Sequence, residues 1–263
     1  MKNINRPIHA ASAIAPTRSH AEAMRLISAE ATDLVLGRIS IDEVQICPQH
    51  AGLISEKSID QLMEAWPNTR FRLHATPQIA GNKGRPIVDA ANAAKHWDVM
   101  ERMAGHSKRL NAPAYSIHAG RRANATLDEA LDTTRRLADL FECRVGIEPL
   151  YPTGSDMWLL SSWREHEQLL NSGVDYALDL SHLQIVAHRS RERQDDLVRA
   201  MLSSPNCIEV HLSYNDGRAD AHLPLDPRKT PWWLDMLDDI HADASIFYEG
   251  VLHMPPRGAK PIH

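Results

Sequence analysis

The chain has 263 residues, of which 43% are hydrophobic and 24% charged, a composition typical of a soluble globular protein. The net charge of −5 argues against a nucleic-acid partner, because proteins that follow phosphate backbones usually carry a basic stripe or domain. The three cysteines are far apart and form no CxxC pair, and no apolar stretch reaches the length of a membrane span. We therefore expect reduced thiols, a cytoplasmic location and no contact with a membrane.

Short apolar runs alternate along the chain with longer segments of helical spacing. In chain order, the predicted strands are 7–13, 42–47, 70–75, 114–118, 143–148, 174–180, 207–212 and 245–249. The predicted helices are 19–32, 58–66, 88–110, 126–141 (which opens with a capping-box sequence), 162–170, 191–202 and 231–240. Eight such strands in about 250 residues predict one α/β domain over residues 1–263, a single (β/α)8 TIM barrel with an irregular tail at 251–263. A doubly wound sheet is the alternative, but no glycine-rich turn follows the first strand.

Ionisable residues recur where the later predicted strands end. In this fold the reactive groups gather at the carboxyl ends of the strands and in the loops that follow them. The residues at these positions are His74, His118, Glu148, Asp179 with His182, His211, the loop pair Asp220 and His222, and Glu249. One histidine at a strand end is more often a core residue than a ligand, but six successive strands that end in His, Asp or Glu form a different pattern.

Such a cluster predicts bound metal. Half-buried charges are costly unless they are paired or coordinated, and crowded carboxylates repel one another unless cations neutralise them. Imidazole and carboxylate ligands without thiolates suit zinc, iron or manganese.

The motifs LHAT, IHAG, GIEP, LDLSH, EVHLS, DAH and YEG, between about residues 70 and 250, resemble those of the xylose-isomerase-like barrel superfamily. This superfamily includes sugar isomerases and epimerases, endonuclease IV and multinuclear non-haem iron oxidative enzymes. The resemblance to the isomerase branch implies one metal held by Glu148, Asp179, His211 and Glu249. The resemblance to endonuclease IV implies two or three divalent ions held by all nine residues at the strand ends and in the DAH motif. A mononuclear isomerase has no evident need for His74, His118 and the Asp220–His222 pair together.

Three reactions follow from this resemblance. We place first a multinuclear iron enzyme that oxidises a peptide or small molecule, in some relatives presented by a partner protein. The alternatives are a zinc phosphoesterase like endonuclease IV, and an isomerase or epimerase of a sugar or sugar phosphate with one metal. The proline after Glu148, where the iron enzymes lead us to expect asparagine, is a departure from the first pattern.

Several residues receive specific roles in this hypothesis. Glu148 is predicted to bridge two ions, with His74 and His118 on one of them, and Glu148, Glu249 and His182 are predicted to be catalytic. Lys83 and Arg85, in the loop after the third strand, would bind an anionic group of the substrate or lie in solvent. Trp158 and Trp232 would stack on the substrate, although packing of helices onto the barrel is the more common role of such residues.

Overall fold

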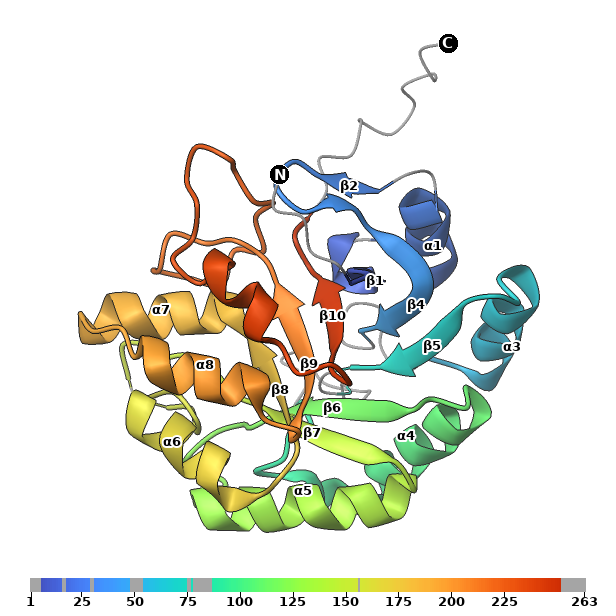
Figure 1. Cartoon of the computed structure of the whole chain (residues 1–263). Coiled ribbons are helices and arrows are strands. Elements are labelled where there is room, and N and C mark those ends of the chain that lie inside the picture. Colours follow the sequence, from blue (N-terminus) through green and yellow to red (C-terminus); the bar gives the residue numbers. More distant parts are fainter. Residues whose placement is uncertain are drawn as a thin grey trace.

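The computed structural model describes residues 6–15, 18–28, 31–47, 54–74, 77, 87–155 and 157–251. Eight parallel strands form one sheet in the order β5-β4-β1-β10-β9-β8-β7-β6. They are β1 (His9–Ala11), β4 (Ser40–Ile46), β5 (Arg70–Leu73), β6 (Ala114–His118), β7 (Arg144–Glu148), β8 (Tyr176–Asp179), β9 (Cys207–Leu212) and β10 (Ser245–Tyr248). A parallel bridge between His74 and Ser116 joins the two edges of this order, so the sheet closes into a barrel (Figure 1). The predicted (β/α)8 fold is confirmed.

Helices surround the strands on the outside of the barrel (Figure 1). They are α1 (His20–Ser28), α3 (Glu56–Ala65), α4 (Trp97–Arg109), α5 (Leu127–Phe141), α6 (Trp163–Ser172), α7 (Leu180–Ser190) and α8 (Asp195–Ser203), with the 3-10 helices η1 (Ser12–Ile14), η2 (Ala93–His96) and η3 (Leu234–Asp239). A short hairpin of β2 (Thr32–Asp33) and β3 (Gly37–Arg38) was not predicted. No helix within the described residues combines the length and the apolar character that crossing a bilayer requires.

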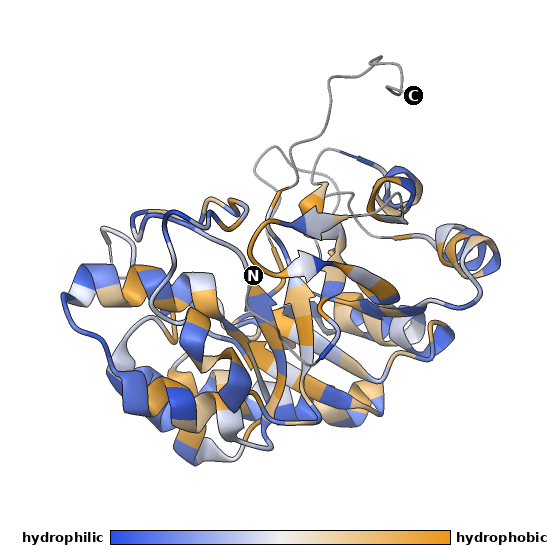
Figure 2. Cartoon of the chain, turned by 45° about the horizontal axis from the view of Figure 1, so that its top comes forward, coloured by the Kyte–Doolittle hydropathy of each residue, from blue (hydrophilic) through white to orange (hydrophobic). Residues whose placement is uncertain are grey.

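Hydrophobic residues are concentrated on the strands and on the helix faces that cover them (Figure 2). Helix α5 shows how the sequence produces this arrangement. The Thr126 hydroxyl accepts a hydrogen bond from the Glu129 amide, and the Glu129 carboxylate accepts one from the Thr126 amide, as the capping box predicts. The helix then buries one apolar face, on which the Phe141 ring stacks on Tyr115 of β6 with 4.4 Å between centroids.

The structure differs from the predicted secondary structure in three places. Residues 88–92 form a turn before η2, because Asp89 and Asn92 exchange side-chain to backbone hydrogen bonds of 2.9 and 3.1 Å. The segment after β8, predicted as strand and loop, is helix α7, which Asp179 caps by accepting from two backbone amides. Residues 231–240 form only η3, so the seventh crossover lacks a full α-helix.

Candidate metal centre

A cavity of about 630 Å³ opens at the carboxyl ends of the strands. It is lined by eight of the nine predicted metal ligands: His74, His118, Glu148, Asp179, His182, Asp220, His222 and Glu249. The ninth, His211 of β9, is fully buried and reaches Glu148 from the barrel interior. The structure therefore brings all nine residues together, because parallel strands of one barrel end on the same face.

Glu148, the last residue of β7, lies at the centre of the group. Its Oε2 atom is 3.3 Å from Nε2 of His74 and 3.4 Å from Nε2 of His118. Its Oε1 atom is 3.4 Å from Nδ1 of His211. Both Oε2 of Glu148 and Nδ1 of His211 are buried without a hydrogen-bond partner, although buried polar atoms are normally satisfied. Such atoms fit metal ligands, and a carboxylate with imidazoles on both oxygens can bridge two ions.

Three histidines each use one ring nitrogen for a structural hydrogen bond. His182 donates from Nδ1 to the Pro149 carbonyl at 2.8 Å, and His211 lies with Nε2 3.0 Å from the Glu209 carboxylate. Nδ1 of His74 is 2.7 Å from the Ser116 hydroxyl. A carbonyl or carboxylate only accepts, so in the first two bonds the ring nitrogen donates, and the other nitrogen is the one that could bind a metal once it is deprotonated.

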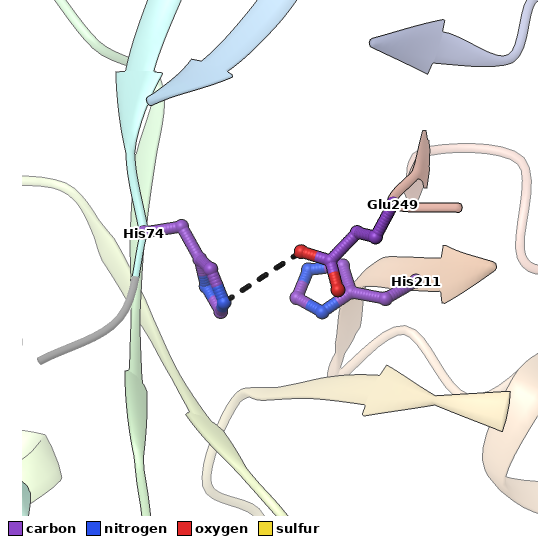
Figure 3. Close-up of side chains that lie close together, drawn as sticks. All are labelled: His74, His211 and Glu249. Atoms are coloured by element: carbon purple, nitrogen blue, oxygen red, sulfur yellow. Dashed lines mark ion pairs between the residues drawn. The ribbon is translucent and has the colours of Figure 1, made fainter. Parts of the chain in front are cut away.

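Ligand atoms of three residue sets approach one another within 4.8 Å. The sets are His74–His118–Glu148, Glu148–Asp179–His211 and His74–His211–Glu249. The first two share only Glu148, so they are compatible with two ions. Figure 3 shows the third set, in which Nε2 of His74 is 3.9 Å from Oε1 of Glu249. The donors are imidazoles and carboxylates, which suit zinc, manganese or iron.

Asp220 and His222 extend the cluster from the loop after β9. Oδ2 of Asp220 lies 2.9 Å from Nε2 of His222 and 3.4 Å from Nε2 of His182. Nδ1 of His222 is 3.6 Å from Oε2 of Glu249. This loop pair thus connects the α7 histidine with the carboxylate that follows β10.

The electrostatics of the cluster favour added positive charge. Burial raises the pKa of Glu148, but the His74 and His118 imidazoles outweigh burial and bring that pKa well below its usual range. Burial raises the pKa of Glu249 to about 7, against the opposing influence of His211. Burial lowers the pKa of His211, yet the Glu249 and Glu148 carboxylates hold it well above its usual value. The buried carboxylates lie within a few ångströms of one another and of imidazole nitrogens, so a bound divalent ion would stabilise their charged forms.

The four residues predicted to contact substrate lie in different places. Trp158 lines the cavity, and its ring is covered by Arg121 with the guanidinium carbon 5.2 Å from the ring centroid. Trp232 is not among the described residues that line the cavity; its ring packs against Arg193 at 4.8 Å. Lys83 and Arg85 lie outside the described residues.

The sequence matches no protein-family model and no curated protein sequence. Solved structures share its fold over nearly the whole chain. AP endonuclease, family 2, from Brucella melitensis aligns with a TM-score of 0.67 at 16% identity, covering 96% of this chain and 95% of that one. A D-tagatose 3-epimerase-like protein gives 0.64 at 16% identity, covering 94% and 92%. IOLI protein, solved with a zinc atom, gives 0.60 at 12% identity, covering 93% and 88%.

The fold is that of the xylose-isomerase-like TIM barrels. These structures include an endonuclease and an epimerase-like protein, and none of the three is named as an iron-dependent oxidative enzyme, which was the function predicted first.

The sequence analysis missed a layer of polar residues beneath the predicted metal ligands. Arg72 pairs with Glu209 at 2.9 Å and donates from Nε to Glu43 at 2.6 Å, and Gln45 donates to Glu209 at 2.9 Å. The signal was available: Arg72 and Glu209 each precede a predicted ligand by two residues, so they point to the same side of their strands. It was overlooked because only the strand ends were considered.

Proposed function

We propose that this protein is a metal-dependent isomerase or epimerase of a small polyhydroxy aldehyde or ketone. The observation that carries this proposal is the placement of two buried carboxylates around one imidazole. Glu148 Oε2 and Glu249 Oε1 lie 3.3 and 3.9 Å from Nε2 of His74 and line the same cavity. The similarity to a D-tagatose 3-epimerase-like protein supports the same class of reaction.

Glu148, Asp179, His211 and Glu249 would hold the ion. When bound, a divalent ion supplies Lewis-acid polarisation of a carbonyl and its neighbouring hydroxyl. Glu249 would remove the proton from the carbon next to the carbonyl. Returning the proton to the former carbonyl carbon, while the proton of the neighbouring hydroxyl moves to the former carbonyl oxygen, gives isomerisation. Returning a proton to the opposite face of the same carbon requires a second group, which is Glu148 in this proposal.

Deuterium exchange tests the proposal independently of product identity. Protein purified with its metal, or loaded with manganese or zinc, is incubated with a panel of ketoses in D2O, and deuterium next to the carbonyl is measured by NMR. We expect exchange with the wild type and loss of at least a hundredfold in Glu249→Gln, as expected for removal of a general base. Glu101→Gln, on the exposed side of α4, is the matched control. Metal-loaded wild type that exchanges no proton in any ketose would refute the assignment.

The second set of ligands favours another candidate, a multinuclear enzyme. One of the three-residue sets consists of His74, His118 and Glu148. A single ion held by Glu148, Asp179, His211 and Glu249 would not use the two histidines of this set. Two or three irons per chain in anaerobically purified protein would favour oxidation of a peptide or small molecule, with or without a partner protein. Three zincs would favour a phosphoesterase. One exchangeable manganese or magnesium would favour the isomerase.

A further inference from the structure

The cavity has a second wall whose residues play no part in holding metal. It is formed by the loops after β5 and β6, and its polar residues include Asn92, Lys95, His96, Arg121 and Asn124. Lys95 and Arg121 are exposed, and both face the same cavity as the predicted ligands.

The structure separates Arg121 and Arg122. Arg122 turns toward α6, where its guanidinium donates to both carboxylate oxygens of Glu165 at 2.6 and 2.9 Å. Arg121 lies on the other side, at the cavity. Among the described residues, no carboxylate lies within ion-pairing distance of the Arg121 guanidinium. One arginine is therefore neutralised by the fold, and the other keeps its charge at the entrance of the site.

The side chain of Arg121 is also held in place. Arg121 and Trp158 form an antiparallel bridge, and the guanidinium lies over the indole ring at 5.2 Å. On either side, Arg122 N donates to Met157 O and Leu159 N donates to Gly120 O, both at 2.9 Å. A guanidinium ordered in this way loses less conformational entropy when it binds a ligand.

One of the five acidic residues in the cavity, Asp89, lies in the same wall, with its carboxylate beside Gly120. The other four, Glu148, Asp179, Asp220 and Glu249, are predicted metal ligands, so bound cations would neutralise them. Asp89 accepts a hydrogen bond from the Asn92 amide, and burial raises its pKa to about 7. With metal bound, the wall formed by Lys95 and Arg121 is the positive end of the cavity.

We infer that Lys95 and Arg121 form an anion subsite, which binds a phosphate or carboxylate group at the far end of a substrate whose polyol end reaches the metal. This inference rests on the proposed function for the placement of the substrate, but the anion subsite itself does not require any particular reaction. Arg121 supplies a planar pair of donors suited to either group, and Lys95 adds a second charge. The cavity of about 630 Å³ has room for a substrate of this kind.

Binding of inorganic phosphate to the zinc-loaded full-length protein tests the subsite by calorimetry. We expect Arg121→Gln to weaken binding about tenfold and Lys95→Gln/Arg121→Gln to weaken it further, with zinc content unchanged. Arg102→Gln, which changes an exposed arginine of α4 in the same way, should bind phosphate like the wild type. Equal phosphate affinity in the wild type and the double variant would overturn the inference, because phosphate would then bind at the metal alone.

Deuterium exchange then separates this inference from the proposed function. A neutral ketose, its phosphate ester and the corresponding sugar acid are compared. We expect the double variant to raise KM about tenfold or more for one or both charged substrates, with kcat and the neutral ketose little changed; the affected substrate identifies the anion. If the wild type catalyses no exchange but Arg121→Gln still weakens phosphate binding, the isomerase proposal is refuted and the anion subsite stands. An equal effect on neutral and charged substrates would overturn the subsite.

Discussion

Glu209→Gln is the substitution that best tests how the barrel interior controls the metal centre. Glu209 is fully buried, and its two oxygens have different partners. Oε1 accepts from His211 Nε2 at 3.0 Å and from Gln45 at 2.9 Å, whereas Oε2 pairs with Arg72 at 2.9 Å. Glutamine is almost the same size but offers one acceptor and one donor, so it cannot serve both sides.

Each orientation of the new amide has a defined cost. If its oxygen stays near His211, its NH2 group faces the Arg72 guanidinium, which has only donors. If the amide turns, the NH2 group faces Nε2 of His211, which must then accept. In that case the ring proton moves to Nδ1, the atom 3.4 Å from Glu148 that would bind the metal. Residues that orient a metal ligand in this manner typically contribute about 10- to 100-fold in metal affinity, or about 1.4 to 2.8 kcal/mol.

Zinc or manganese titration of the purified protein, with a chromophoric chelator as competitor, measures this effect. Glu43→Gln is the matched control: Glu43 also pairs with Arg72 in the same layer, but no contact joins it to His211 among the described residues. We expect weaker metal binding in Glu209→Gln and near-normal binding in Glu43→Gln, with both variants folded by circular dichroism. A folded Glu209→Gln protein with wild-type metal affinity would show that this carboxylate does not orient His211.

Three further predictions concern other parts of the molecule. Glu148→Gln should abolish bound metal and activity while the barrel still folds; a fully metallated, active variant would remove Glu148 from the site. Burial lowers the pKa of His166 to about 4 against its Ser162 hydrogen bond, so the unfolded chain binds the extra proton first and stability falls as the pH drops from about 6.5 to 4. His166 contributes about 3 kcal/mol to that loss of stability. His166→Gln should therefore make the free energy of unfolding, measured by chemical denaturation, depend less on pH between about 6.5 and 4. An unchanged pH dependence of this free energy would contradict the argument. Thr126→Ala removes the cap of α5 and should cost about 1 kcal/mol in the same assay, whereas wild-type stability would mean that the capping box contributes nothing.

Much of the architecture was predictable from local patterns. The apolar runs predicted all eight barrel strands, and the residue at the end of each later strand predicted which side chains meet at one face. The prediction succeeded because all strands of a parallel barrel run in the same direction and end on the same face. His74 and Glu249 are far apart in sequence, yet Nε2 of His74 lies 3.9 Å from Oε1 of Glu249. The helix after β8 was missed because Asp179 belongs both to the strand and to the helix cap.

The sequence by itself determined the barrel and the chemical types of side chain at its mouth, since both depend on short-range periodicity and on the order of elements. Only the tertiary structure decided how those side chains are used. It determined which nitrogen of His211 faces Glu148, because the Glu209 carboxylate is fixed by Arg72 from another strand. It also determined that Arg122, rather than Arg121, pairs with Glu165, because Glu165 of α6 lies on one side of that loop. Such contacts depend on where distant strands and loops meet in space, which no local pattern specifies.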